Sequence, residues 1–159
     1  MKFNKISEEQ FKSDGVDKYC NYSDIKLPKR ATRLSAGYDI FCLSDLTLSP
    51  GETVLMPTGI QIVLDEDKAL LILPRSGLGF KYRTQLWNTV GLIDADYHYS
   101  HNEGHMWVKM INESDKVLNI KAGEAFCQAV IIQYFKVDDD EASATRDGGF
   151  GSTSGSLNI

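Results

Sequence analysis

The sequence predicts an all-β fold, a sandwich or a barrel, preceded by one short helix. From Gly37 onward, short apolar runs alternate with turn residues, and this spacing is typical of all-β domains. The chain has 159 residues, of which 42% are hydrophobic and 25% charged, values close to those of globular proteins. We therefore expect a folded domain rather than a disordered or fibrous chain.

The helix is expected near the N-terminus, where residues 7–10 read SEEQ. In such a capping box the Ser7 hydroxyl accepts an early helical N–H, and the Gln10 side chain reaches back to the start of the helix. The helix then runs from Glu8 until Gly15 ends it. Little else in the chain is expected to be helical.

The strands follow in order along the chain. Apolar runs predict them at residues 38–42, 53–64 with a break at 57–59, 69–73, 105–111, 117–120 and 125–134. Two segments between these runs, 49–52 (SPGE) and 121–124 (KAGE), contain the residues that tight turns favour. Each turn is expected to join two strands.

The C-terminal segment differs from the rest of the chain. After Phe135 an acidic run leads into a stretch rich in Gly and Ser that holds Arg146 and Phe150. Such a segment cannot bury enough apolar surface to order itself, so a mobile tail is expected. The alternative is a strap that closes over a ligand, anchored by Arg146 and Phe150, with glycine N–H groups around phosphate oxygens.

Charge and cysteine content exclude several classes. A net charge of −5 argues against binding of nucleic acid or of a membrane surface, which needs a basic patch. Cys20, Cys42 and Cys127 form no C-x-x-C pair, so neither a disulfide framework nor a zinc site is expected. No stretch has the apolar length of a signal peptide or a membrane span, so the default location is cytoplasmic.

Residues 73–79 (LPRSGLG) follow an apolar run and place Arg75 and Ser76 at the end of a predicted strand. The planar guanidinium can donate two parallel hydrogen bonds to a phosphate, and a neighbouring Gly77 lets backbone N–H groups approach it. A surface turn with an exposed Arg explains the same pattern. These residues alone support the two interpretations about equally.

Residues 88–97 (NTVGLIDADY) are the densest polar stretch among apolar residues. Asp94 directly follows Gly-Leu-Ile, so its carboxylate is expected to be partly buried, where it could accept a proton from an attacking water. Asp94 and Asp96 would lie on one face of a strand and could share a cation. A polar hairpin tip is the alternative.

The three histidines, His98, His101 and His105, lie within eight residues of one another, beside Asp96 and Glu103. Their spacing fits no zinc signature. We expect them on a solvent-exposed inserted loop, because loops collect polar residues.

Five stretches of the chain, in order, resemble the five motifs of the homotrimeric deoxyuridine triphosphatases (dUTPases). They are 36–40 (AGYDI), 74–78 (PRSGL), 91–97 (GLIDADY), 123–128 (GEAFCQ), and Arg146 with 149–153 (GFGST). The resemblance implies a distorted antiparallel β-barrel of jelly-roll type. It divides the chain into an N-terminal extension (1–23), the β-barrel domain (24–137) and a flexible C-terminal arm (138–159) that closes an active site.

The resemblance also implies an activity, the Mg²⁺-dependent hydrolysis of dUTP to dUMP and pyrophosphate at three sites between subunits. This reaction limits uracil incorporation into DNA and supplies dUMP for thymidylate synthesis. Asp94 matches the general base that activates the water attacking the α-phosphorus. Tyr97 matches the ring that packs on deoxyribose and leaves no room for a 2′-hydroxyl. Asn88, with the main chain around Gly91 and Ile93, matches the hairpin that pairs with uracil.

The remaining motif residues match phosphate and metal contacts of the family. Those matching phosphate contacts in the central motifs are Arg75, Ser76, Gly77 and Gln128. Asp39 matches a residue that meets the metal indirectly, through water. In the C-terminal motif, Arg146 matches the γ-phosphate clamp and Phe150 the aromatic lid over uracil, while Gly151, Ser152 and Thr153 join the phosphate cradle.

The sequence departs from the family pattern at three places. Residues 99–103 form a five-residue insertion before Gly104, and the spacing from Arg146 to Phe150 is one residue shorter than usual. Arg83 and Trp87 stand where small residues are frequent in bacterial members.

Other functions remain open from the sequence. The nearest is a dCTP deaminase-like enzyme of the same fold, which needs a proton shuttle, usually Glu, at the base. Ammonia release from dCTP, against pyrophosphate release from dUTP, separates the two. A nucleotide-binding regulatory relative with a protein partner, and a plain jelly-roll structural protein, are the others.

Overall fold

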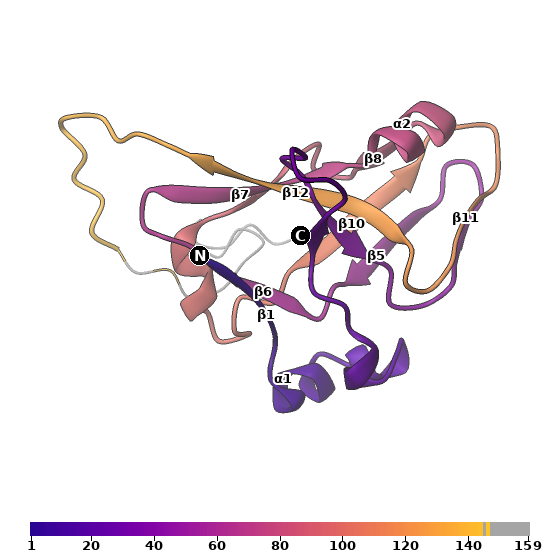
Figure 1. Cartoon of the computed structure of the whole chain (residues 1–159), viewed down its shortest axis with the longest axis horizontal. Helices are drawn as coiled ribbons and strands as arrows, with labels where there is room; N and C mark the ends of the chain where they lie inside the picture. Colours follow the sequence, from indigo (N-terminus) through magenta and orange to yellow (C-terminus); the bar gives the residue numbers. More distant parts are fainter. Residues whose placement is uncertain (145, 147–159) are drawn as a thin grey trace, which may run out of the picture.

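The computed structural model describes residues 1–144 and 146, and the fold of this part is all-β, as the sequence predicts (Figure 1). The strands are β1 (Lys2–Lys5), β2 (Lys29–Arg30), β3 (Tyr38–Phe41), β4 (Leu46–Leu48), β5 (Thr53–Pro57), β6 (Ile60–Val63), β7 (Lys68–Pro74), β8 (Thr84–Leu86), β9 (Gly91–Ile93), β10 (Trp107–Asn112), β11 (Leu118–Ile120) and β12 (Ala125–Gln133). The helices are α1 (Glu8–Ser13) and α2 (Ser76–Tyr82), with single 3₁₀ turns η1 (Val16–Lys18), η2 (Tyr22–Asp24) and η3 (Ala95–Tyr99).

The strands pair antiparallel in separate sheets around one core. The largest sheet has the order β2-β3-β12-β7-β9, and the others are β5-β10-β8, β11-β4 and β1-β6. The all-β fold agrees with the distorted β-barrel that the family resemblance implies, although hydrogen-bonded ladders among the described residues do not close it fully. Strands as short as β4, β8 and β9, three residues each, cannot carry an unbroken ladder around a barrel.

The predicted apolar runs and turns are confirmed. The 53–64 run forms β5 and β6, and the 125–134 run forms β12. The 49–52 turn joins β4 to β5 and the 121–124 turn joins β11 to β12, with Gly51 and Gly123 both at φ +79°. This left-handed conformation is accessible to glycine at little cost, which explains both residues.

Helix α1 forms where the sequence predicts it, but its capping differs. The Gln10 N–H donates to Ser7 Oγ (3.0 Å), as expected. The Gln10 side chain does not reach back: it donates to Asp14 Oδ1 (2.9 Å). The Ser7 N–H is instead satisfied by a distant carboxylate, Glu103 Oε2, at 2.7 Å.

Helix α2 contradicts the expectation of little further helix. Its two glycines lower helix propensity, so the 73–79 segment reads as a turn. The helix forms because Leu78 and Tyr82 pack against the core, and it ends at Arg83, which adopts a left-handed conformation (φ +47°).

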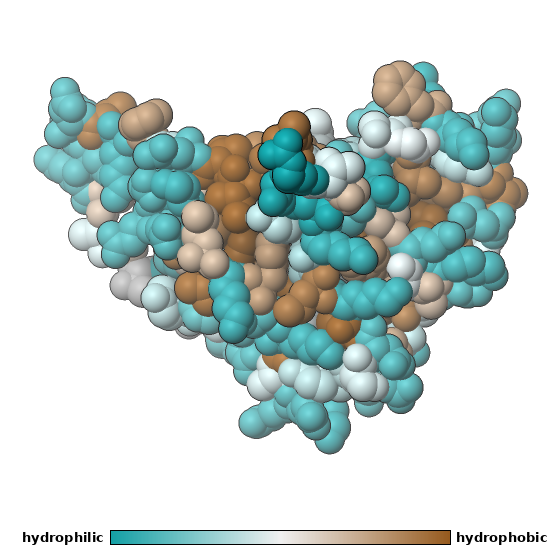
Figure 2. All heavy atoms as spheres, in the orientation of Figure 1, coloured by the Kyte–Doolittle hydropathy of each residue, from teal (hydrophilic) through white to brown (hydrophobic). Residues whose placement is uncertain are grey.

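The N-terminal segment is part of the core. Strand β1 pairs with β6, and Ile6, Phe11 and Val16 are buried with the residues of the large sheet. Figure 1 shows α1 and the chain after it covering one end of the molecule. On the face seen in Figure 2, hydrophobic residues reach the surface in a hollow surrounded by hydrophilic ones. No helix among the described residues is long and apolar enough to cross a bilayer.

Candidate active site

A cavity of about 590 Å³ lies beside β9 and β10, and it gathers many of the residues predicted for the nucleoside side of a site. The predicted residues that line it are Asn88, Gly91, Ile93, Asp94, Tyr97 and Arg146. Its volume lies in the range of small-molecule sites. Most of these predicted residues come from one stretch of chain, residues 88–97.

The hairpin between β8 and β9 shapes one wall of this cavity. The Thr89 N–H donates to the Leu86 carbonyl (2.9 Å), and Thr89 has φ +68°. A β-branched residue is strained in this left-handed region, and such strain gathers at functional sites. Gly91 faces Ile72 of β7, where an added Cβ would lie 3.1 Å from Ile72 Cβ, so close packing of the strands favours glycine.

Asp94 follows β9 directly and begins η3. Its side chain is 40% exposed, in agreement with the predicted partial burial. Asp96 lies within η3, so the prediction of two carboxylates on one strand face is wrong. They nevertheless share a cation, the guanidinium of Arg146, whose NH2 contacts Asp94 Oδ2 and whose Nε donates to Asp96 Oδ1 at 3.1 Å. The arginine of the C-terminal motif is thus held at the cavity.

Tyr97 forms a buried wall of the cavity. Its hydroxyl donates to the His105 carbonyl (3.0 Å) and accepts from Asn102 Nδ2 (2.9 Å). Burial raises the pKa of the Tyr97 phenol, against an opposing effect of the Asn102 hydrogen bond. The hydroxyl therefore stays protonated and able to donate.

The predicted phosphate contacts form a second cluster outside the cavity. Arg75 Nε lies 3.0 Å from Asp39 Oδ1, and an Arg75 NH1 donates to the Ala125 carbonyl (3.3 Å). Gln128 faces Asp39 across β12 and β3 and donates to the Pro74 carbonyl (3.0 Å).

Ser76 and Gly77 open α2 beside Arg75, and the first N–H groups of a helix have no intrahelical acceptor. An added Cβ at Gly77 would meet nothing within 4 Å, so packing within the chain does not require this glycine. An open approach to the backbone is what a bound phosphate would use.

The two clusters lie at opposite ends of β7. Ile93 pairs with Leu70 and Gly91 with Ile72, so Asp94 lies near the start of β7, whereas Arg75 directly follows its end. At ~3.3 Å per residue, about six residues of strand separate them by roughly 20 Å. The structure therefore does not bring Asp94 and Arg75 together within one chain.

The side chains of the described residues fit a magnesium ion only if substrate phosphates and water supply most of its ligands. Residues 1–144 and 146 contain no group of three or more His, Cys, Asp or Glu side chains that could hold a metal ion. Mg²⁺ prefers oxygen ligands and is commonly bound by one or two carboxylates, waters and substrate phosphates. Asp39, the carboxylate that the sequence predicts near a metal, forms an ion pair with Arg75 among the residues predicted to contact phosphate.

The histidine loop differs from its prediction. His105 is fully buried, not solvent-exposed, because its ring fills a polar pocket between Asp14 and Gly59. His98 contacts Gln61, and His101 is exposed.

Sequence reasoning missed several residues that line the cavity. They are Trp87, Trp107, Leu55, Leu86, Met106 and Val108. Lys109 Nζ lies over the Trp87 ring, 4.6 Å from its centre. The signal was present at Trp87, a large aromatic residue already noted as a departure from the bacterial members of the resembled family. Phe150, Gly151, Ser152 and Thr153 lie outside the described residues.

Comparisons with known proteins point to one family. A family model described as dUTPase matches residues 23–154. The deoxyuridine 5′-triphosphate nucleotidohydrolase of Lactococcus lactis is 40% identical over 141 residues, which cover 87% of this chain and 93% of that protein. Its counterpart in Shewanella baltica is 44% identical over 137 residues, 81% and 87% of the two chains. The crystal structure of a Streptococcus mutans dUTPase has a TM-score of 0.69 and 32% identity, covering 87% of this chain and 99% of that one.

Proposed function

The chain belongs to the dUTPase family, and we propose that it hydrolyses dUTP to dUMP and pyrophosphate. The observation that carries this proposal is the nucleoside-sized cavity, which Asp94 and Arg146 line together while in contact with each other. The activity would limit uracil incorporation into DNA and supply dUMP for thymidylate synthesis.

The base is read by the β9 hairpin. Among the described residues no strand pairs with the outer edge of β9, so backbone groups around Gly91 and Ile93 are available to uracil. Asn88 adds a side-chain amide at the same wall. The Tyr97 ring packs on deoxyribose and excludes a 2′-hydroxyl, because a buried ring tied by its hydroxyl has little freedom to move aside.

Asp94 acts as the general base. Its half-exposed carboxylate accepts the proton of the water that attacks the α-phosphorus, and pyrophosphate leaves. Arg146 contacts the γ-phosphate, which competes with Asp94 and Asp96 for the guanidinium. Binding of the triphosphate therefore frees the Asp94 carboxylate for the water. In the C-terminal arm, Phe150 covers uracil, and Gly151, Ser152 and Thr153 contact phosphate.

The phosphates are held by Arg75, Gln128 and the N–H groups of Ser76 and Gly77. Mg²⁺, held by the phosphates and through water by Asp39, would neutralise their charge when bound. General-base catalysis supplies only ~10²–10⁴-fold, so positioning and charge stabilisation must supply most of the acceleration.

A site that contains both Asp94 and Arg75 requires more than one chain. Roughly 20 Å of β7 separate Asp94 from Arg75, too far for both to contact one α- and β-phosphate pair. Phe80 and Phe135 are exposed at 93% and 87%, and they supply apolar surface that another copy of the chain would bury. We therefore propose the homotrimer of the family, with each site between subunits.

The test is a substrate panel. Pyrophosphate release is measured with Mg²⁺ from dUTP, UTP, dTTP and dCTP, together with ammonia release from dCTP. Selective turnover of dUTP supports the proposal. Ammonia from dCTP would instead show a deaminase, and nucleotide binding without turnover would show a regulatory relative.

A further inference from the structure

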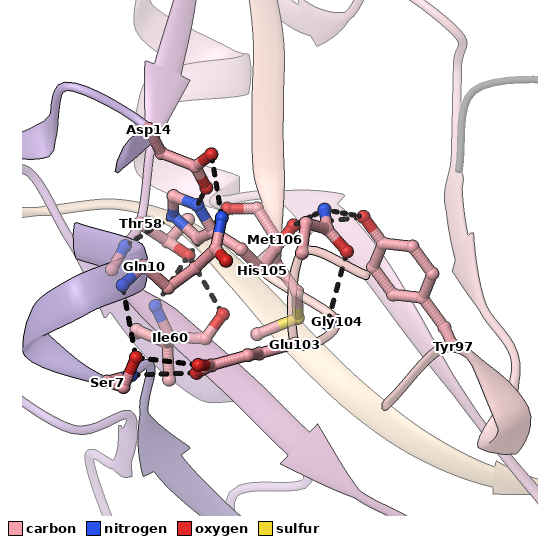
Figure 3. Close-up of polar contacts among 12 residues, drawn as sticks. Ser7, Gln10, Asp14, Thr58, Ile60, Tyr97, Glu103, Gly104, His105 and Met106 are labelled. Atoms are coloured by element: carbon pink, nitrogen blue, oxygen red, sulfur yellow. Dashed lines mark hydrogen bonds and ion pairs between the residues drawn. The ribbon is translucent and has the colours of Figure 1, made fainter. Parts of the chain in front are cut away.

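Two segments have no role in the proposed site: the first 23 residues and the 99–103 insertion. The structure places them against each other, as Figure 3 shows. Ser7, at the start of α1, contacts Glu103, and Asp14, just after α1, contacts His105. These contacts join parts of the chain more than 90 residues apart.

The first contact fixes the turn of the inserted loop. The Glu103 carboxylate accepts hydrogen bonds from the Ser7 N–H (2.7 Å) and from Ser7 Oγ (2.6 Å). Glu103 and Gly104 both have positive φ, +57° and +69°. A Cβ at Gly104 would lie 2.8 Å from His98 Cα, so the loop passes directly over the end of η3.

The second contact fixes His105. The Gly59 N–H donates to Nε2 (3.0 Å), so Nδ1 carries the ring proton and donates to Asp14 Oδ2 (2.6 Å). The imidazole is thus neutral, fully buried and held from two sides. Burial lowers the pKa of His105, while the hydrogen bond and charge of Asp14 oppose this shift.

Both contacts hold the segment of chain that hydrogen-bonds to the Tyr97 hydroxyl. Its hydroxyl donates to the backbone carbonyl of His105 and accepts from Asn102, and Asn102 Oδ1 in turn accepts the Gly104 N–H at 3.2 Å. The polar end of Tyr97 is therefore held by the inserted loop, and the loop is held by α1 (Figure 3). Tyr97 also lines the cavity.

We propose that the N-terminal segment, through Asp14 and Ser7, positions Tyr97 and so sets the discrimination between deoxyribose and ribose. This inference rests on the proposed function, in which the Tyr97 ring faces the sugar. Asp14, Ser7 and His105 touch no substrate and act as positioning residues. Loss of their contacts lets the loop, and with it the ring, move away and admit a 2′-hydroxyl.

The experiment compares three substitutions in the full chain. Asp14→Ala removes the acceptor for His105 and for the Gln10 side chain, whereas Asp14→Asn keeps one oxygen acceptor. Asp17→Asn makes the same Asp-to-Asn change at an exposed position three residues away. The kcat and KM are measured for dUTP and UTP. Asp14→Ala should lower the dUTP/UTP ratio of kcat/KM by about tenfold, with KM for dUTP rising more than kcat falls. Asp14→Asn and Asp17→Asn should stay within about twofold of the unchanged protein.

A variant at the other contact keeps the inference testable if Asp14→Ala fails to fold. Glu103→Ala removes the Ser7 contacts and should shift the ratio in the same direction. Thermal unfolding identifies which variants are folded. An unchanged ratio in folded Asp14→Ala or Glu103→Ala overturns the inference alone. A parent protein that does not hydrolyse dUTP overturns the proposed function and this inference with it.

Discussion

On the proposed function, mixing two inactive variants should restore activity, because the Asp94 and the Arg75 of one chain would serve two different sites between subunits. Asp94→Asn removes the proposed base, and Arg75→Ala removes the proposed phosphate contact at the far end of β7. Each variant alone has no complete site. In a mixed trimer, a site between an Arg75→Ala chain that supplies Asp94 and an Asp94→Asn chain that supplies Arg75 is complete.

The size of the recovery follows from the geometry. With equal amounts and random association, a site receives an intact Asp94 half of the time and an intact Arg75 half of the time, so about one quarter of sites are complete. A matched control mixes unchanged chains with the double variant. It also gives about one quarter if sites lie between chains, but about one half if each site lies within one chain.

The assay uses co-expressed chains with two affinity tags, purified without separating the mixed species, and follows pyrophosphate release from dUTP. Sedimentation confirms that each variant keeps the oligomeric state of the unchanged protein. No recovery from the two single variants, together with about half activity in the control, would refute the inter-subunit site and the ~20 Å separation on which it depends.

Three further predictions concern single positions. Asp94→Asn should lower kcat by ~10²-fold or more while binding of a non-hydrolysable dUTP analogue survives, which calorimetry checks. Phe150→Ala should lower kcat/KM by roughly 5- to 150-fold, the worth of ~1–3 kcal/mol of base stacking, and Phe150→Trp should retain much of the activity. Burial holds the pKa of His105 below 6.5, so the unfolded chain binds the proton more readily. The free energy of unfolding should therefore fall as pH drops below 6.5, and denaturant titrations should show a smaller slope in His105→Gln.

The sequence predicts what local chemistry determines. Strands such as β7 and β12 come from long apolar runs, and the glycine turns at 51 and 123 come from a conformation that few other residues adopt. The nucleoside side of the site is equally predictable, since Asn88 to Tyr97 are contiguous and need only one hairpin to face one cavity.

What the sequence does not predict depends on distant partners. Strand β1 exists because β6, about 60 residues later, offers an edge, and α2 exists despite its glycines because Leu78 packs on the core. The predicted capping by the Gln10 side chain is wrong for the same reason, a partner that is distant in the sequence. No local pattern announces that a carboxylate 96 residues away takes the Ser7 N–H.

The charge balance of the site connects these observations to the chemistry. An acidic chain that binds a triphosphate must keep its site cations in place, and here both arginines of the proposed site are paired with carboxylates: Arg75 with Asp39, and Arg146 with Asp94 and Asp96. On the proposed function, the phosphates therefore replace these carboxylates as the partners of the two arginines. For Arg75 this exchange would leave Asp39 available to hold a magnesium ion through water. For Arg146 it releases Asp94, so the base becomes free to accept a proton only when the γ-phosphate has taken its place on the guanidinium.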